Sequence, residues 1–276
     1  MSSQSDIRRD LGVSEAFDAH TELGNRVQFI KDYLQTSGLR SLVLGISGGV
    51  DSTTAGLIAQ RAVRELRSAG GAARFIAVRL PYGVQADASD ADAAIEAIKP
   101  DLVLEINVQP ATDAMWQSLQ QRGFPEAQPG RADLLRGNIK ARQRMIAQFA
   151  IAAAFDGLVI GTDHAAEAAM GFFTKFGDGA ADILPLSGLS KRRVRALARA
   201  LGAPEHLIEK VPTADLEDLA PLRPDEEAYG VTYDEIDDFL EGQTVANRVS
   251  EVITARYRAT LHKRALPAAP MRSKNA

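Results

Sequence analysis

The feature that most constrains this chain is an eight-residue loop, Gly-Ile-Ser-Gly-Gly-Val-Asp-Ser, at positions 45–52. It follows an apolar run at positions 42–44 and leads into a stretch with the periodicity of an amphipathic helix. Gly48 and Gly49 have no Cβ, so the backbone can bend tightly and bring its amide groups against an anion at a helix N-terminus. Asp51 adds a carboxylate of the kind that binds Mg²⁺. An ordinary strand-to-helix turn needs only one or two such residues, so we interpret the loop as a phosphate cradle followed by a metal ligand.

The order of apolar and helical segments predicts an α/β fold with a parallel sheet. Short apolar runs alternate with alanine-rich helical stretches, as they do in sheets whose strands are joined by helices. The apolar runs lie at positions 42–46, 75–80, 102–108 and 158–160. In such sheets, ligands bind beyond the carboxyl ends of the strands. We therefore expect one crevice to be formed by the loops at 45–52, 79–85 and 161–164.

Helical patterns flank this core in the sequence. One covers positions 14–34 and is expected to end at Gly38, and the chain beyond Lys191 is again mostly helical. Proline residues interrupt the stretch at 211–229, which we expect to be a long, mobile loop.

A long helix is expected over positions 131–155, where apolar residues recur every three or four positions. This stripe consists of Leu135, Ile139, Ile146, Phe149 and Ala153. Arg142 falls on the stripe, and two interpretations of it remain open. Its guanidinium could reach solvent from the helix edge, or it could stand at an interface and bind a phosphate or a carboxylate.

Composition limits the partners and the compartment. The formal net charge is -4 and the pI is near 5.7, which disfavours a general nucleic-acid surface. The chain has no cysteine, which excludes a disulfide, a thiolate zinc site and a cysteine-type glutaminase of its own. Any nitrogen donor is therefore expected to arrive as a free molecule. The first ten residues do not resemble a signal peptide and no apolar run is long enough to span a bilayer, so we expect no membrane partner and a cytoplasmic location.

A second group of candidate ligands lies at positions 161–185, after the last apolar run. Its potential ligands are Thr162, Asp163, His164, Glu167, Lys175, Asp178 and Asp182. Glu167 would lie on the helix that begins here, where its carboxylate could share a metal ion with Asp51. His164 has no second histidine at a metal-binding interval, so a hydrogen-bonded structural role is the favoured interpretation. Three phenylalanines surround Lys175 in sequence, which indicates a cation in partly apolar surroundings that binds an anion.

Taken together, these motifs resemble those of a known enzyme family. The loop at 45–52 is similar to the pyrophosphate-binding loop of the N-type ATP pyrophosphatases, and it lacks the Gly-Lys-Ser/Thr ending of the Walker loop. The further motifs are KAR at 140–142, GTDHAAE and GFFTKFGDG within 161–185, PTADLED at 212–218 and HKR at 262–264. With this set, the chain resembles the ammonia-dependent NAD⁺ synthetases over nearly its whole length.

The resemblance implies one domain built on a doubly wound parallel sheet of the adenine nucleotide alpha-hydrolase-like, Rossmann-like type, with helical extensions at both ends. The ATP pyrophosphatase core would cover residues 38–200, the C-terminal helical part residues 201–264, and the tail residues 265–276. This tail, ALPAAPMRSKNA, lacks the aromatic and acidic residues that are often found near the end of the family's chains.

The resemblance also implies a reaction. ATP would adenylate the nicotinate carboxylate of deamido-NAD⁺ (nicotinic acid adenine dinucleotide) with release of pyrophosphate, and ammonia would then displace AMP to give NAD⁺. A carboxylate has no good leaving group, whereas an acyl adenylate expels AMP. Such a carbon–nitrogen ligase would be a homodimer with substrate sites at the subunit interface. Two alternatives remain: another N-type ATP pyrophosphatase that adenylates a different carboxylate, a nucleobase or a tRNA, and a regulatory module that holds ATP without turnover.

Individual roles are implied where this sequence matches the family's motifs. The residues implied to bind ATP are Gly45, Ile46, Ser47, Gly48, Gly49, Val50, Asp51, Ser52, Arg79, Gln85, Thr162, Lys191 and Thr213. Those implied to bind deamido-NAD⁺ are Arg142, Lys175, Asp182, His262 and Lys263. Asp51 and Glu167 would hold Mg²⁺, and Asp51 and Lys191 would be catalytic. Asp178 is our candidate for the base that takes a proton from ammonium.

Overall fold

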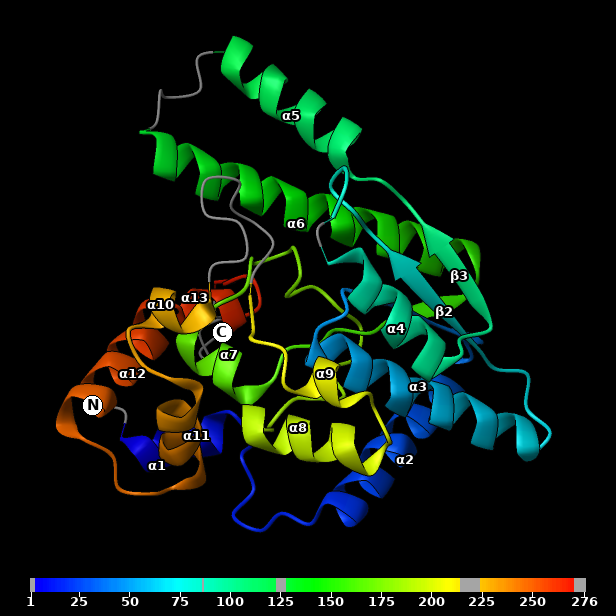
Figure 1. Cartoon of the computed structure of the whole chain (residues 1–276), viewed down its shortest axis with the longest axis horizontal. Helices are drawn as coiled ribbons and strands as arrows, with labels where there is room; N and C mark the ends of the chain where they lie inside the picture. The colour runs from blue at the N-terminus through cyan, green and yellow to red at the C-terminus, as the bar shows by residue number, and fades with distance from the viewer. Residues whose placement is uncertain (1–2, 86, 123–127, 214–223, 271–276) are drawn as a thin grey trace, which may run out of the picture.

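The computed structural model describes residues 3–85, 87–122, 128–213 and 224–270. Its centre is a four-stranded parallel sheet with the strand order β3-β2-β1-β4 (Figure 1). The strands are β1 (Ser41–Gly45), β2 (Arg74–Arg79), β3 (Leu102–Glu105) and β4 (Gly157–Val159). Parallel pairing of strands that alternate with helices confirms the predicted α/β fold.

Helices surround the sheet, and a further group of them gathers where the N-terminal and C-terminal parts of the chain meet (Figure 1). In chain order they are α1 (Gln4–Asp10), α2 (Ala19–Ser37), α3 (Val50–Ser68), α4 (Ala88–Ile98), α5 (Gln109–Gln121), α6 (Pro129–Ala154), α7 (Ala165–Met170), α8 (Lys191–Ala200), α9 (Glu205–Ile208), α10 (Asp225–Tyr229), α11 (Tyr233–Glu241), α12 (Asn247–Ala259) and α13 (Leu261–Arg264). Within the described part of the chain, no helix combines the length and the apolar character that crossing a membrane requires.

The sheet is covered by helices on both faces, as a doubly wound fold requires. Leu42 and Leu44 of β1 pack into a cluster with buried residues of α2, α3 and α8. Val43 packs into a different cluster with Ile151 and Ala152 of α6. Successive residues of a strand point to opposite faces, so α3 and α6 lie on opposite sides of β1. The loop that follows β1 is therefore supported from both faces of the sheet.

A third cluster joins the two ends of the chain. It includes Ile7 of α1, Met170 of α7 and Ile253 of α12. Helix α1 was not expected from the sequence. It begins at Ser3 with a capping box, in which the serine hydroxyl accepts a backbone N–H and the side chain of Asp6 accepts the N–H of Ser3. The helical extensions at both ends thus share one core.

The second helix starts later than predicted. It was expected from position 14 but begins at Ala19, because the Asp18 carboxylate caps it by accepting the N–H of Thr21. Gly38 ends the helix in the left-handed conformation, with a φ of 70°, and this confirms the predicted stop.

Two other boundaries also differ. The strand predicted to reach position 108 ends at Glu105, and Val108 is already the N-cap residue of α5. The stretch 211–229 was predicted to be a loop, but Asp225–Tyr229 forms the short helix α10. Positions 214–223 lie outside the described residues.

The apolar stripe predicted along α6 is not the buried face of that helix. Ile146 is 52% exposed, and Ala153 is exposed as well. The buried positions on α6 are Asp133, Gly137, Lys140, Ala141, Ile151 and Ala152. The helix packs on β1, β4 and α5 through these mostly small or polar residues, which leaves apolar side chains on its outer surface.

Candidate active site

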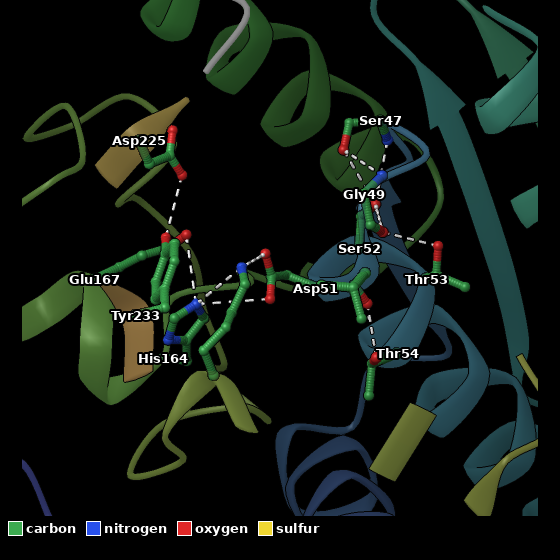
Figure 2. A network of polar contacts seen from close by, with 12 residues as sticks. Ser47, Gly49, Asp51, Ser52, Thr53, Thr54, His164, Glu167, Asp225 and Tyr233 are labelled. Atoms are coloured by element: carbon green, nitrogen blue, oxygen red, sulfur yellow. Dashed lines mark hydrogen bonds and ion pairs between the residues drawn. The ribbon is translucent and has the colours of Figure 1, made fainter. Parts of the chain in front are cut away.

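The loop between β1 and α3 forms the tight turn that its glycines predict. Gly48 has a φ of 82°, in the region that favours glycine, and a Cβ there would lie 2.5 Å from the backbone nitrogen of Ala91. The hydroxyl oxygens of Ser47 and Ser52 lie 3.2 Å apart and fix the turn (Figure 2). Gly49, the N-cap of α3, provides no side-chain cap, so the first N–H groups of the helix are left for an anion.

Asp51, in the first turn of α3, forms an ion pair with Lys191 at the start of α8. The Lys191 Nζ lies 2.7 Å from the Asp51 Oδ2, although 140 residues separate the two in sequence. Lys191 is only 1% exposed, and its Nζ lies 4.9 Å from the centre of the Tyr233 ring. Burial opposes the charged forms, but the attraction between the two groups outweighs it: the pKa of Lys191 is raised and that of Asp51 is lowered.

His164 and Glu167 complete this group of polar side chains (Figure 2). His164 is the N-cap residue of α7, and Glu167 lies in the first turn of the same helix. The His164 Nε2 lies 3.6 Å from the Asp51 Oδ1 and 3.5 Å from the Glu167 Oε1. Burial would lower the pKa of His164, but the charges of Glu167 and Asp51 raise it overall. The sequence favoured a purely structural histidine, and the structure places it between both predicted metal ligands.

Asp51, His164 and Glu167 fit a divalent cation. Each offers one donor atom, and these atoms all lie within 4.8 Å of one another. The Asp51 Oδ1 is buried and accepts no hydrogen bond from the described residues, so this carboxylate oxygen has room for a cation. Proteins hold Mg²⁺ through one or two carboxylates together with substrate phosphates. The two carboxylates beside the loop at 45–52, which we call the phosphate loop, have this composition.

A cavity of about 600 Å³ runs along the phosphate loop and these carboxylates. The predicted residues that line it are Gly45, Ile46, Ser47, Gly49, Asp51, Ser52, Gln85, Thr162, Glu167, Asp178, Thr213 and Lys263. Lys191 does not line the cavity itself, but it forms an ion pair with Asp51, which does. Three loops that follow β1, β2 and β4 therefore meet at the carboxyl end of the sheet, as the strand pattern predicted.

Sequence reasoning missed several residues of the cavity wall. They are Arg144, Gln148, Lys210 and Asp225. The Gln148 Oε1 accepts the N–H of Gly45 at 2.8 Å and so holds the end of β1 from the neighbouring helix α6. None of these residues stands in a motif of its own, although the KAR motif at 140–142, within two helical turns of them on α6, could have drawn attention to Arg144 and Gln148.

The other predicted residues are not among those that line the cavity: Gly48, Val50, Arg79, Arg142, Lys175, Asp182 and His262. Arg79 is engaged at the sheet edge, where its Nη1 lies 2.9 Å from Asp92 Oδ1 and 3.2 Å from Glu105 Oε2. Asp182 accepts the N–H of Val159 at 2.7 Å and so fixes the end of β4.

Four of the five predicted dinucleotide-binding residues are connected around the loop after α7. The Lys175 Nζ donates to the main-chain oxygen of His262 at 2.5 Å, and the Arg142 Nη2 donates to the main-chain oxygen of Lys175 at 3.3 Å. The Lys263 Nζ donates to two main-chain oxygens of the same loop, each at 2.9 Å. Three cationic side chains are thus gathered at one corner, which suits a ligand with several phosphate oxygens.

Asp178 and Asp163 are aspartates of the cavity wall whose pKa values are raised. Asp178 accepts the N–H of Thr174 at 2.9 Å, and its side chain is accessible from the cavity, yet desolvation there raises its pKa. Burial and the neighbouring Glu167 charge raise the pKa of Asp163 well above its ordinary range. A carboxylate with a raised pKa accepts a proton more readily near neutral pH, which is what a general base must do.

Asp225 provides a test of the electrostatics of this cavity. It is 6% exposed, and its pKa is raised to about 6, first by burial and then by the charge of Glu167. Because the folded-state value lies above the ordinary 3.8, the protein loses stability as the pH rises through this interval. We therefore expect Asp225→Asn to raise the free energy of unfolding by about 1 to 3 kcal/mol near pH 8, and to leave it nearly unchanged near pH 3. Thermal unfolding at the two pH values measures this.

Asp237 is the matched control for this substitution. Its pKa is also raised to about 6 by burial, but its two carboxylate oxygens accept the backbone N–H groups of Lys191 and Arg192. Asp237→Asn replaces one acceptor by a donor and should lower the melting temperature. If Asp225→Asn instead lowered the free energy of unfolding near pH 8, burial of a charged Asp225 beside Glu167 would not be destabilising, and the prediction would be wrong.

The chain is similar to known proteins of one family. A sequence model of the NAD synthase family matches residues 22–267. The chain is 60% identical over 266 residues to the NH(3)-dependent NAD(+) synthetase of Burkholderia cenocepacia (strain HI2424), which covers 96% of this chain and 94% of that protein. It is 59% identical over 267 residues to the protein of the same name from Streptomyces coelicolor, with 97% of both chains covered.

Two solved structures are similar to this chain over most of its length. The crystal structure of an NAD+ synthetase from Burkholderia pseudomallei matches with a TM-score of 0.83 and 56% identity, over 96% of both chains. An NMN synthetase from Francisella tularensis matches with a TM-score of 0.81 and 35% identity, over 92% of this chain and 99% of that one. Because the family model covers most of the sequence and the relatives match along nearly their full length, the chain belongs to the NAD synthase family.

Proposed function

We propose that this chain catalyses the ATP-dependent amidation of deamido-NAD⁺ by free ammonia, with AMP and pyrophosphate as the other products. Relatives that are 59% and 60% identical are named NH(3)-dependent NAD(+) synthetases. The observation that carries the proposal is that one cavity contains the phosphate loop and the carboxylates of Asp51, Glu167 and Asp178. This arrangement supports phosphate binding, adenylation and proton removal within one space.

The phosphate loop and α3 serve the first step. Main-chain N–H groups at the start of α3, which no side-chain cap occupies, bind the phosphates of ATP. A carboxylate oxygen of the nicotinate attacks the α-phosphorus, and pyrophosphate leaves. Asp51 and Glu167 would hold Mg²⁺, which would neutralise charge on the phosphates. The loop lacks a Walker lysine, and Lys191 brings a cation to Asp51 from a different helix.

Asp178 serves the second step. Ammonium gives one proton to its carboxylate, and the nitrogen of the resulting ammonia attacks the acyl carbon. AMP then leaves with the oxygen that had attacked the phosphorus, and a second proton is released as the amide forms. The raised pKa of Asp178, caused by desolvation in the cavity, supports its assignment as the proton acceptor.

The outer surface of α6 supports a homodimer. Arg142, which we propose as a ligand of deamido-NAD⁺, is exposed on this helix and does not line the cavity of its own chain. Ile146 lies one helical turn later on the same side of the helix and is 52% exposed. An arginine beside uncovered apolar surface fits an interface at which each subunit contributes to the other's substrate site.

We expect Ile146→Asp to produce a monomer with strongly reduced amidation, because a carboxylate would be buried at the centre of the proposed interface. Light scattering during size-exclusion chromatography gives the mass, and an activity assay follows NAD⁺. Phe29→Asp on α2, where the phenylalanine is 41% exposed, is the matched control and should remain dimeric. A dimeric, fully active Ile146→Asp protein would rule out this interface.

A direct assay tests the proposed substrate. Purified protein with ATP, Mg²⁺ and an ammonium salt should convert deamido-NAD⁺ to NAD⁺, with AMP and pyrophosphate in equal amounts. The alternative substrate is nicotinic acid mononucleotide, because an NMN synthetase has this fold at 35% identity. We expect kcat/KM to be at least about tenfold higher for the dinucleotide. A preference for nicotinic acid mononucleotide would overturn the assignment.

A further inference from the structure

Lys210 connects two walls of the cavity that are far apart in sequence. Its Nζ lies 2.7 Å from the Asp87 Oδ2 and 2.7 Å from the Asp90 Oδ2. Lys210 and Asp87 are 123 residues apart in sequence. All three side chains are between 21% and 27% exposed, so solvent screens this double ion pair only in part. Asp87 and Lys210 both line the cavity.

The position of this lysine is unusual for a helix end. Asp87 is the N-cap residue of α4, and Asp90 lies in its first turn. An N-terminal aspartate normally accepts a backbone N–H of its own helix, but Asp87 makes no side-chain cap. The positive end of the helix dipole also disfavours a cation nearby. The Asp87 carboxylate instead accepts a hydrogen bond from the Lys210 Nζ, so the ion pair with Lys210 replaces the hydrogen bond that would cap the helix.

The first turn of α4 supports the phosphate loop directly. A Cβ at Gly48 would lie 2.5 Å from the backbone nitrogen of Ala91 and 2.6 Å from the carbonyl carbon of Asp90. The loop backbone therefore packs against the same turn that carries Asp90. Any displacement of this turn changes the support of the loop.

The segment that carries Lys210 leads to another proposed ATP residue. Thr213 follows three positions later, lines the cavity, and forms a β-bridge with Pro224. The N–H of Asp225 donates to the main-chain oxygen of Pro212 at 3.1 Å, which ties this segment to α10. Lys210 thus joins the Thr213 segment to the turn that supports Gly48.

We propose that Lys210 is a positioning residue for ATP, which holds the Thr213 segment and the phosphate loop in register through Asp87 and Asp90. The inference rests on the proposed use of ATP by this cavity. It differs from a direct phosphate contact by Lys210, in which the two aspartates would compete with ATP for the lysine.

Substitution of the lysine is the first test. Lys210→Met should raise the KM for ATP about three- to tenfold, with a smaller change in kcat, and Lys210→Arg should restore most of the affinity. The melting temperature should change little, because Asp87 and Asp90 remain favourable at the N-terminus of α4. Lys31→Met is the matched control: this lysine is also 21% exposed and paired with an acid, Glu65, and it should keep the wild-type KM. An unchanged KM in Lys210→Met overturns the proposal.

Substitution of both acids separates positioning from direct contact. If Lys210 acts through the aspartates, Asp87→Asn/Asp90→Asn should also raise the KM for ATP, and adding Lys210→Met should cause little further change. If Lys210 binds phosphate itself, removing its two competitors should lower the KM, and this result would refute the positioning role. Calorimetric titration with ATP alone measures the same affinities without turnover. A wild-type protein that binds ATP but makes no NAD⁺ would count against the proposed function and leave this test intact.

Discussion

Asp51→Asn is expected to reduce ATP-dependent release of pyrophosphate by about a thousandfold or more. Asparagine keeps the size of the side chain but removes the charge that pairs with Lys191 and that we propose to hold Mg²⁺ with Glu167. The measurement is pyrophosphate release in the presence of saturating ATP, Mg²⁺ and deamido-NAD⁺. A folded Asp51→Asn protein that releases pyrophosphate at the wild-type rate would refute the metal role of Asp51.

Asp101→Asn serves as the control for this substitution. Asp101 also pairs with a cation, Arg67, and accepts the N–H of Phe75 at 2.7 Å. It directly precedes β3 and so lies at the amino ends of the parallel strands, whereas the phosphate loop follows the carboxyl end of β1. The control should lose some stability and keep its rate of pyrophosphate release, whereas Asp51→Asn should lose the rate.

Lys191→Met is expected to have the second-largest effect, a loss of about 100- to 1000-fold in the rate of adenylation. The Lys191 Nζ is 2.7 Å from Asp51 and fully enclosed, so no solvent cation replaces it without rearrangement. The substitution also leaves the Asp51 carboxylate without its partner, at a cost of about 2 to 4 kcal/mol in folding free energy. The double variant Asp51→Asn/Lys191→Met should be more stable than Lys191→Met and remain inactive.

The stability lost in Lys191→Met should be large near neutral pH and should decrease as the pH falls. Burial works against the charge of Asp51, but Lys191 holds its pKa below 3.8, so the pair stabilises the fold above that value and loses this effect as the pH falls through the folded-state pKa. The pKa of Lys191 is raised above 10.5, so the contribution persists until the pH rises through that higher value. Thermal unfolding should show a large deficit near pH 7 that shrinks as the pH falls below 3.8. A deficit that stays the same size as the pH falls would show that packing, and not the ion pair, is lost.

The parts of the site that the sequence predicted are those with local causes. Two adjacent glycines followed by an aspartate can be interpreted within eight residues, and the structure shows the tight turn they require. The alternation of apolar runs and helices predicted the parallel sheet and the edge where Thr162 and Gln85 meet the loop. Each of these inferences depends on residues that are close in sequence or on a general rule of strand connection.

Features that depend on distant contacts could not be predicted in this way. Lys191 could be assigned to ATP only through resemblance, and its pairing with Asp51 joins positions 140 residues apart. The contact between Lys210 and Asp87 spans 123 residues and has no motif. The surface that covers the α6 stripe could not be predicted, because periodicity shows that a helix has an apolar face but not what packs against that face.

The central claim is that the nicotinate carboxylate attacks the α-phosphorus of ATP, and an isotope transfer tests it most directly. Deamido-NAD⁺ labelled with oxygen-18 in both carboxylate oxygens should be converted with ATP, Mg²⁺ and ammonium, and the products analysed by mass spectrometry. The account predicts one labelled oxygen in AMP, one in the amide of NAD⁺ and none in pyrophosphate. Unlabelled AMP, or formation of ADP and phosphate in its place, would contradict adenylation of the carboxylate.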